Sequence, residues 1–227
     1  MQTLFAASVL HADFKKLPEQ LRILDVNGIN RYHFDIMDGH FVPNFGISPA
    51  IMASINHLTE LPFEAHLMIE HPEQFISMIA QAGAASILVH AETTLQLRRV
   101  IGQIRKAGCR PGVALNPTTP PDALSYILPD VSSVLLLSAD VGDTEHSAFS
   151  DTVLDKIREV RDLINDQRLA VEVMVEGGIT QERIGPCVRA GADVIILGTS
   201  GLFSQPDLAA AIRAARQSAL NARQMLA

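Results

Sequence analysis

The sequence contains no tryptophan, only two cysteines, and aromatic residues at 5% of its 227 positions. Cys109 and Cys187 stand alone, with neither the paired spacing of a zinc site nor the number of cysteines that a disulfide framework needs. No apolar run approaches the roughly 18 residues of a membrane-spanning helix, and the N-terminus lacks the basic region of a signal peptide. We therefore expect a cytoplasmic protein that does not enter the membrane.

Basic residues are also scarce, with 18 Lys and Arg against 25 Asp and Glu, so the formal charge is −7. No basic run is interleaved with aromatic residues, which argues against a nucleic acid as partner. Hydrophobic residues make up 48% of the chain, enough for a substantial core. Because no linker divides the sequence, we expect one domain that spans residues 1–227, a length typical of an α/β barrel.

Short apolar runs alternate with longer segments of helical periodicity. The runs that predict strands cover 4–10, 31–37, 62–68, 86–90, 110–115, 133–138, 170–175 and 193–198. The clearest helical segments cover 14–27, 72–82, 94–107, 152–165 and 206–225. Alternating βα units suit an open doubly wound sheet or a closed barrel, and eight strands in this length favour the barrel. The predicted fold class is therefore α/β, a single (βα)8 TIM barrel.

Polar residues gather at the carboxyl ends of these runs, where a barrel carries its functional site. Side chains alternate between the two faces of a strand, so in 31–37 the apolar Tyr32, Phe34 and Ile36 share one face. His33, Asp35 and Met37 then face the inside of the barrel. In 170–175, the three valines at 171, 173 and 175 face outward by the same reasoning. Glu176 would therefore point inward at the top of the barrel.

Two imidazoles and two carboxylates that converge from three strands suit a divalent metal such as zinc, iron, manganese or cobalt. These residues are His33, Asp35, His66 and Glu176. Three more polar residues lie at strand ends: His90, Asn116 and Ser138. No second observation points to a function for any of them, so a structural place on the barrel rim and a functional role are equally good interpretations. Asp38 and His40 are expected to position or cap the loop in which they lie.

Several segments together resemble the ribulose-phosphate 3-epimerase family nearly end to end: "ASVLHADF", "HFDIMDGHFVPN", "EAHLMIEHP", "LNPTTP", "MVEGGI" and "LGTSGLF". The most specific are His33-Phe34-Asp35 and His66-Leu67-Met68. The segments "DIMDGHFVPN" and "GTSGLF" are especially similar to the allulose-6-phosphate epimerase branch. The resemblance implies an isomerase that inverts C3 of a ketose phosphate, of the type that interconverts ribulose 5-phosphate and xylulose 5-phosphate.

The resemblance also implies roles for residues. Asp35 and Glu176 would exchange a proton with opposite faces of the substrate carbon through an enediolate, and one divalent metal ion per subunit would be held by His33, Asp35, His66 and Glu176. Substrate would be bound by Ser8, Met37, His66 and Met68, and its phosphate by backbone groups at Gly177, Gly178, Gly198 and Thr199. Relatives suggest a homo-oligomer.

Two features depart from the family pattern. The position before the paired glycines is Glu176 where the family has Asp, and the loop after the sixth strand reads "SADVGDTEHSAF" instead of a Gly-rich sequence. Its acids, Asp140, Asp143 and Glu145, are unfavourable beside a phosphate dianion. Two alternatives therefore stay open: an epimerase or isomerase for allulose 6-phosphate or another sugar, and a paralogue that binds metal or sugar without turnover. A decarboxylase or aldolase is disfavoured because no D-x-K-x-x-D cluster ends a strand.

Overall fold

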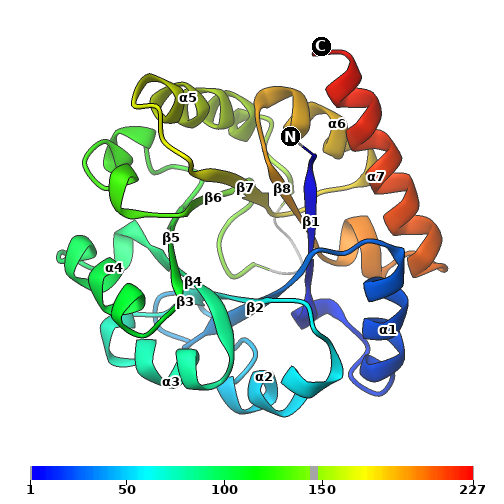
Figure 1. Cartoon of the computed structure of the whole chain (residues 1–227), viewed down its shortest axis with the longest axis horizontal. Coiled ribbons are helices and arrows are strands. Elements are labelled where there is room, and N and C mark those ends of the chain that lie inside the picture. The colour runs from blue at the N-terminus through cyan, green and yellow to red at the C-terminus, as the bar shows by residue number, and fades with distance from the viewer. Residues whose placement is uncertain (1, 144–147, 227) are drawn as a thin grey trace.

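Eight parallel strands close into one barrel. The computed structural model describes residues 2–143 and 148–226, and its strands pair in chain order, with β8 returning to β1 (Figure 1). This confirms the predicted (βα)8 TIM barrel. The strands are β1 Leu4–Ser8, β2 Arg31–Met37, β3 Phe63–Met68, β4 Ala84–His90, β5 Arg110–Leu115, β6 Ser133–Leu137, β7 Glu172–Glu176 and β8 Val194–Leu197.

Helices surround the barrel (Figure 1). They are α1 Leu17–Asn27, α2 Pro49–Ile55, α3 Ile76–Gln81, α4 Leu97–Lys106, α5 Thr152–Asp166, α6 Gln181–Ala190 and α7 Leu208–Gln224. The five segments with the clearest periodicity correspond to α1, α3, α4, α5 and α7, and α5 ends one residue beyond its predicted segment. Helix α6 escapes that pattern because Gly185 and Pro186, two poor helix formers, lie inside it. None of the described helices has the length and apolar character that crossing a membrane requires.

The connection between β5 and β6 differs from the others. It forms two short 3₁₀ segments, Pro121–Leu124 and Leu128–Asp130, where the other connections of the described chain carry α-helices. Proline lacks a backbone N–H and disfavours the α conformation in the residue before it, and this connection contains four prolines. They are Pro117, Pro120, Pro121 and Pro129. The chain therefore crosses this side of the barrel without an α-helix.

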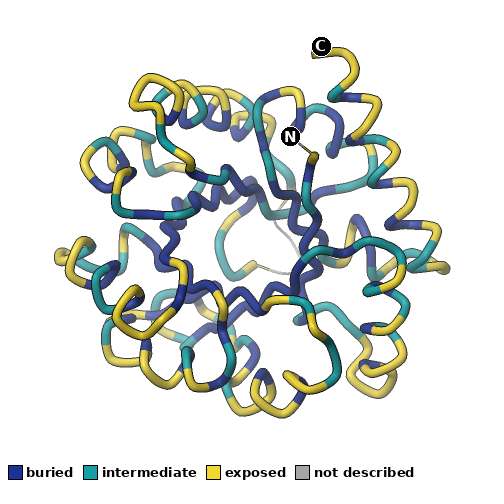
Figure 2. Tube along the Cα trace, viewed as in Figure 1, coloured by how far each residue is buried: buried dark blue, intermediate teal, exposed yellow. Residues whose placement is uncertain are grey.

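Side chains of the strands alternate between two apolar environments, as their parity predicts. The outward set packs in the main core against the helices and includes Tyr32, Phe34, Ile36, Val173 and Val175. The inward set forms a smaller layer inside the barrel: Ala6, Leu88, Ala114, Leu135, Leu137, Met174, Val194 and Ile196. Most strand residues are buried, while the helices expose their outer faces (Figure 2). Asp35 and Glu176 therefore belong to the inward face, above this apolar layer.

A buried charge cluster lies at the opposite end of the strands. The Nη1 atom of Arg31, the first residue of β2, is 3.2 Å from Oε2 of Glu64 and 3.1 Å from Oε2 of Glu172. Burial alone would raise the pKa of Glu64, but hydrogen bonding and charge from His33 and Arg31 outweigh it and lower the pKa. Glu64 is thus an ionised carboxylate inside the barrel, satisfied on two sides.

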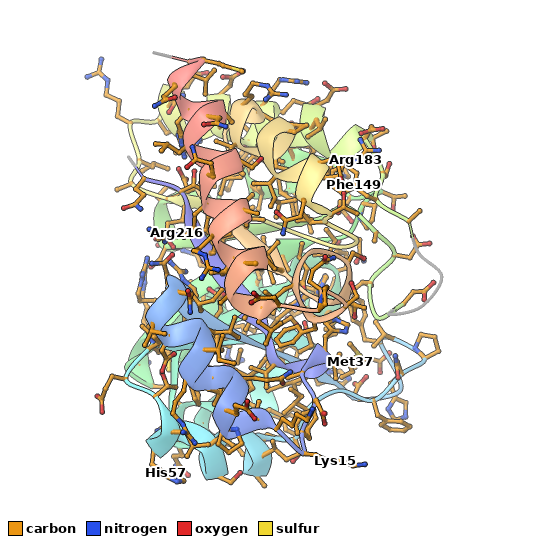
Figure 3. All side chains as sticks on the ribbon, turned by 90° about the vertical axis from the view of Figure 1, so that its right-hand side faces the viewer. Lys15, Met37, His57, Phe149, Arg183 and Arg216 are labelled. Atoms are coloured by element: carbon orange, nitrogen blue, oxygen red, sulfur yellow. The ribbon has the colours of Figure 1, made fainter. Side chains whose placement is uncertain are left out.

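The described ends of the β6–α5 connection are tied to the barrel mouth. The backbone N–H of Ser150 donates to the carbonyl of Ser138 over 2.7 Å. The guanidinium carbon of Arg183, on α6, lies 4.8 Å from the centre of the Phe149 ring, a cation–π contact (Figure 3). On the other side, the side-chain amide of Asn44 donates to the carbonyl of Gly142 over 3.1 Å. These contacts hold residues on both sides of the loop beside the site.

Candidate functional site

Four side chains meet inside the barrel at the carboxyl ends of β2, β3 and β7. One ligand atom from each of His33, Asp35, His66 and Glu176 lies within 4.8 Å of the others. Nε2 of His33 is 3.3 Å from Asp35 Oδ1 and 3.3 Å from Glu176 Oε2. Nδ1 of His66 is 3.2 Å and 3.4 Å from the same two oxygens. The structure therefore brings together all four residues that the sequence predicts as metal ligands.

The donor set fits a divalent cation. His33 Nε2 and Glu176 Oε2 are buried and have no hydrogen-bond partner of acceptable geometry among the described residues. Both atoms face the centre of the cluster, where a cation would satisfy their lone pairs. Two imidazole nitrogens and two carboxylate oxygens suit a metal of borderline hardness, and two carboxylates balance a charge of +2. The cluster could therefore hold one divalent ion.

The electrostatics of the cluster keep both carboxylates ionised. Burial alone would raise the pKa of Asp35, but the charge of the adjacent His33, together with the hydrogen bond and charge of His66, outweighs it and holds the pKa well below its usual value. The pKa of Glu176 is also lowered: burial and the charge of Asp35 raise it, and the two histidines more than compensate. Burial lowers the pKa of His33, but Glu176 and Asp35 raise it well above its usual value. A divalent cation could replace this positive charge.

Two buried neighbours, Ser8 and Glu64, orient side chains of the cluster. The Ser8 hydroxyl donates to Asp35 Oδ2 over 2.6 Å, and Ser8 is fully buried rather than part of the pocket wall. Nδ1 of His33 lies 2.9 Å from Oε1 of Glu64. This carboxylate–histidine contact is typical of the outer shell of metal sites, and it leaves Nε2 of His33 free to face the cluster. Glu64 was not singled out from the sequence, although it shares the inward parity of His66.

The undecided strand-end residues take different places. His90 lies against the cluster, with its Nε2 2.8 Å from Nε2 of His66. The Ser138 hydroxyl donates to the carbonyl of Glu176 over 2.8 Å and so supports the turn after β7. Asn116 contributes its backbone N–H to Glu92, outside the cluster. The structure therefore links His90 to the cluster, which the sequence could not decide.

Asp38 holds the loop that follows β2, as the sequence predicts. Its Oδ1 accepts the backbone N–H groups of His40 and Phe41 over 2.8 and 2.9 Å, and its Oδ2 accepts the backbone N–H of Glu70 over 2.8 Å. The loops after β2 and β3 are joined in this way beside the site. Both oxygens of the Asp38 carboxylate accept backbone hydrogen bonds, and His40 is exposed.

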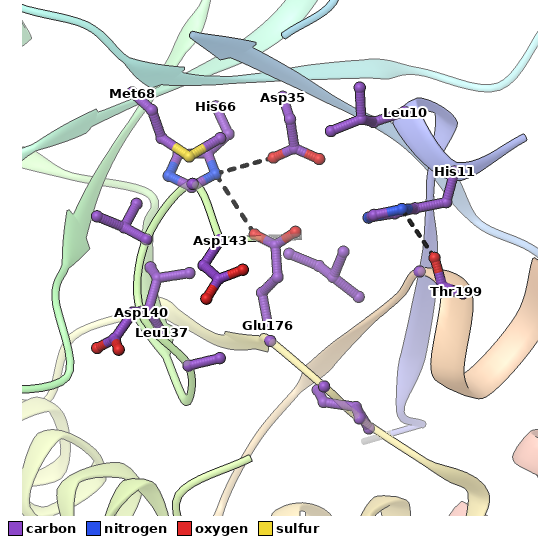
Figure 4. A pocket seen from close by; sticks show the side chains of 18 of the residues that line it. Leu10, His11, Asp35, His66, Met68, Leu137, Asp140, Asp143, Glu176 and Thr199 are labelled. Atoms are coloured by element: carbon purple, nitrogen blue, oxygen red, sulfur yellow. Dashed lines mark hydrogen bonds and ion pairs between the residues drawn. The ribbon is translucent and has the colours of Figure 1, made fainter. Parts of the chain in front are cut away.

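A pocket opens above the cluster (Figure 4). Its wall includes most of the residues predicted to bind metal or substrate: Asp35, Met37, His66, Met68, Glu176, Gly177, Gly178, Gly198 and Thr199. Met37 and Met68 pack with Val42 into a small apolar cluster that covers one side. The wall also contains His11, which the sequence did not single out and whose Nδ1 lies 2.9 Å from the Thr199 hydroxyl (Figure 4).

The pocket has an acidic wall. Asp140 and Asp143 line it together with Asp35 and Glu176, and no lysine or arginine occurs among the described lining residues (Figure 4). Glu145, the third acid predicted in this loop, lies outside the described residues. Both aspartates of the β6–α5 connection therefore contribute to the wall of the pocket, and both are exposed.

Comparisons with known proteins agree with this geometry. Residues 4–203 match the ribulose-phosphate 3 epimerase family. The chain belongs to this family. It is 39% identical to ribulose-phosphate 3-epimerase of Synechocystis sp. over 94% of this chain and 93% of that protein. It is 36% identical to ribulose-phosphate 3-epimerase of Bacillus subtilis over 94% and 98%.

Solved structures add the fold alone. KGPDC from Streptococcus mutans aligns with a TM-score of 0.72 at 13% identity over 97% of this chain and 99% of that one. At this identity only the barrel architecture is shared. Family membership, in contrast, confirms the prediction of an isomerase, an epimerase that acts on carbohydrates.

Proposed function

We propose that this protein is a metal-dependent 3-epimerase of a ketose phosphate, with ribulose 5-phosphate as the first candidate substrate. The observation that carries the proposal is the buried cluster of two imidazoles and two carboxylates, with orphaned atoms on His33 and Glu176. It lies at the floor of a pocket at the carboxyl end of the barrel, in a chain of the ribulose-phosphate 3-epimerase family. A bound divalent cation would stabilise negative charge on the substrate oxygens next to the reacting carbon.

Asp35 and Glu176 perform the proton transfers in this proposal. Both are ionised carboxylates at the pocket floor, and they come from different strands, β2 and β7. Before turnover Glu176 takes up a proton from solvent. Asp35, as the carboxylate, then removes the C3 proton from one face of the substrate, and Glu176 gives its proton to the other face, which inverts the centre and leaves Asp35 protonated and Glu176 ionised. The reverse reaction exchanges the two roles. Ser8 holds Asp35 through its Oδ2 and so limits the rotation of the carboxylate.

The remaining pocket residues bind the sugar and exclude water. Met37 and Met68 present polarizable thioethers from β2 and β3, beside the two acid–base groups, and Val42 backs them. At the other side, the backbone after β7 and β8 lines the pocket at Gly177, Gly178, Gly198 and Thr199. Gly177 and Gly178 have positive φ angles of 105° and 54°. Such backbone can point N–H groups at an anion, and we assign the phosphate to this side.

Metal content tests this proposal directly. We expect purified protein to carry about one divalent ion per chain, and His33→Ala or His66→Ala to lose it, because each variant removes one of four ligands. Elemental analysis of the three proteins measures this, with circular dichroism as the control for folding. Unchanged metal stoichiometry in both folded variants would rule out this centre.

The acidic wall favours a second candidate: an epimerase for a sugar without a phosphate dianion, or for another ketose phosphate such as allulose 6-phosphate. Asp140 and Asp143 are exposed and line the same pocket as Glu176, and carboxylates that face the same binding space repel a phosphate dianion. We therefore expect Asp140→Asn and Asp143→Asn to raise kcat/KM for a phosphorylated ketose more than for its free form. Asp122→Asn, an exposed acid outside the pocket wall, is the matched control.

A panel of phosphorylated and free ketoses separates the two candidates. Activity on ribulose 5-phosphate at least equal to that on free ribulose supports the first candidate. Wild-type activity confined to free sugars would exclude the sugar-phosphate proposal. If the metal-loaded protein turned over no ketose, the remaining alternative would be a paralogue that binds metal or sugar without catalysing a reaction.

A further inference from the structure

A line of polar side chains leaves the cluster from the nitrogen of His66 that faces away from Asp35 and Glu176. Nδ1 of His66 faces Asp35 and Glu176, and its other nitrogen faces away from them (Figure 4). That nitrogen, Nε2, lies 2.8 Å from Nε2 of His90, at the end of β4. Nδ1 of His90 lies 3.2 Å from Oε2 of Glu92, whose Oε1 accepts the backbone N–H of Asn116 over 2.9 Å.

The 2.8 Å separation of the two Nε2 atoms restricts where protons can lie. One nitrogen must donate and the other accept, because two N–H groups or two lone pairs cannot face each other at this distance. A nitrogen that binds a cation offers its lone pair, so a neutral His66 that ligates through Nδ1 carries its proton on Nε2. His90 must then accept through a bare Nε2 and carry its own proton on Nδ1. That proton is donated to the carboxylate of Glu92.

We infer that His90 and Glu92 are positioning residues that keep the Nδ1 atom of His66 unprotonated and aimed at the metal centre. The inference rests on the proposed metal site. It states that His90 and Glu92, which are not ligands themselves, determine which nitrogen of the ligand His66 carries the proton. Every contact in the line has one donor and one acceptor in this arrangement, from the cluster to the backbone of Asn116.

The surroundings of the pair support the assignment. His90 is fully buried, and the Phe41 ring covers it with centroids 4.9 Å apart. The other histidine ligand, His33, is oriented by the carboxylate of Glu64. The centre thus has one ligand held by a carboxylate and one held by an imidazole.

Glu92→Gln keeps the size of the side chain but reverses which group donates and which accepts in the hydrogen bonds from residue 92 to His66. The backbone N–H of Asn116 needs an acceptor, so the amide oxygen takes the place of Oε1 and the NH₂ group faces His90. His90 then accepts through Nδ1 and carries its proton on Nε2, where it faces the N–H of His66 Nε2, so that two donors meet. The conflict ends only if the proton of His66 moves to Nδ1, where the cation binds. We expect the Zn²⁺ affinity to fall by about 10–100-fold, the usual effect of changing an outer-shell partner.

Zn²⁺ dissociation constants, measured by competition with a chelator, provide the first test. The matched control is Glu70→Gln, which removes the same charge from an exposed position after β3 and should leave the affinity at the wild-type value. His90→Phe keeps a ring and removes the acceptor, so it should also weaken Zn²⁺ binding. In that background Glu92→Gln should add no further loss, because Glu92 acts through His90.

Imidazole ¹⁵N NMR of the zinc-loaded proteins provides a second test that a merely structural role would not affect. We expect wild-type His66 to be protonated at Nε2 and His90 at Nδ1, and Glu92→Gln to move the proton of His90 to Nε2. Equal Zn²⁺ affinity in Glu92→Gln and Glu70→Gln, or a wild-type His90 protonated at Nε2, would overturn this inference and leave the metal centre standing. A wild-type protein that binds no Zn²⁺ would overturn both.

Discussion

At the scale of single residues, the length of the side chain at 176 decides whether the second carboxylate reaches the centre. Glu176 Oε2 lies 3.3 and 3.4 Å from the two histidine nitrogens, so the longer side chain is accommodated within the cluster. The two-residue period of a strand was enough to predict that this residue and Asp35 face inward. It could not predict the His66–His90 contact, which depends on the stagger of β3 against β4 and on the rotamers of two rings. The inward parity of Glu64 was readable, but its contact with His33 depends on the register of β3 against β2.

Asp35→Asn tests the first proton transfer. An amide cannot accept the C3 proton, so we expect exchange of that proton with solvent to fall by about 10²–10⁴-fold, the usual contribution of a general base. Proton exchange followed by NMR measures the rate, and metal analysis with circular dichroism confirms a loaded, folded variant. Near-normal exchange would show that Asp35 is not the base.

Glu176→Gln tests the second transfer. We expect net inversion to fail while exchange through Asp35 continues, because only one face of the substrate loses its acid–base group. Glu176→Asp is the matched comparison: it keeps a carboxylate, and we expect it to retain or raise turnover of ribulose 5-phosphate. Chiral analysis of the product provides the readout. Full inversion by the Gln variant would exclude the two-carboxylate mechanism.

At the scale of elements, the loop after β2 is packed directly onto that strand. The backbone N–H of Ile47 donates to the carbonyl of Asp35 over 2.7 Å, and a Cβ placed on Gly46 would overlap that carbonyl and lie 2.7 Å from Met37 N. The apolar runs predicted the strands well, since each is buried on both faces. They could not predict this return of the loop, nor α6 with its internal Gly and Pro, because both depend on tertiary packing.

Gly46→Ala should therefore displace the backbone that carries Asp35. We expect a loss of stability of about 1–3 kcal/mol, as for other overpacked sites, together with weaker metal binding. Gly102→Ala is the matched control, since nothing lies within 4 Å of its added Cβ in the middle of α4, and it should stabilise the protein by about 0.5–1 kcal/mol. Urea unfolding measures both. Equal stability of the two variants would contradict the packing interpretation.

At the scale of the whole molecule, the barrel brings residues from distant parts of the sequence to one mouth, and its acids carry a pH dependence of stability. Burial alone would raise the pKa of Glu92, but hydrogen bonds from His90, Thr119 and the backbone of Asn116 outweigh it and lower the pKa to about 2.

Composition and strand count predicted the architecture. That residues 1–227 form one domain, that the chain is cytoplasmic and homo-oligomeric, and that it binds no nucleic acid stay predictions.

The lowered pKa of Glu92 has a definite sign in stability. Because the folded pKa lies below the ordinary value of 4.5, the stabilisation is complete above about pH 4.5 and is lost as the pH falls toward 2. We expect the difference in free energy of unfolding between wild type and Glu92→Gln to shrink over this range. Urea unfolding of both proteins at a series of pH values measures it. A difference that stays constant with pH would contradict the assigned ionisation.

The most direct measurement of the proposed activity follows the reacting carbon itself. The metal-loaded wild-type protein is incubated with ribulose 5-phosphate, and with the other ketose phosphates and free ketoses, in heavy water and observed by NMR. We expect deuterium to appear at C3 of a ketose phosphate together with the C3-inverted product, and a chelator to abolish both. Absence of deuterium at C3 of every ketose tested, with metal bound, would contradict the proposal that this site is an epimerase.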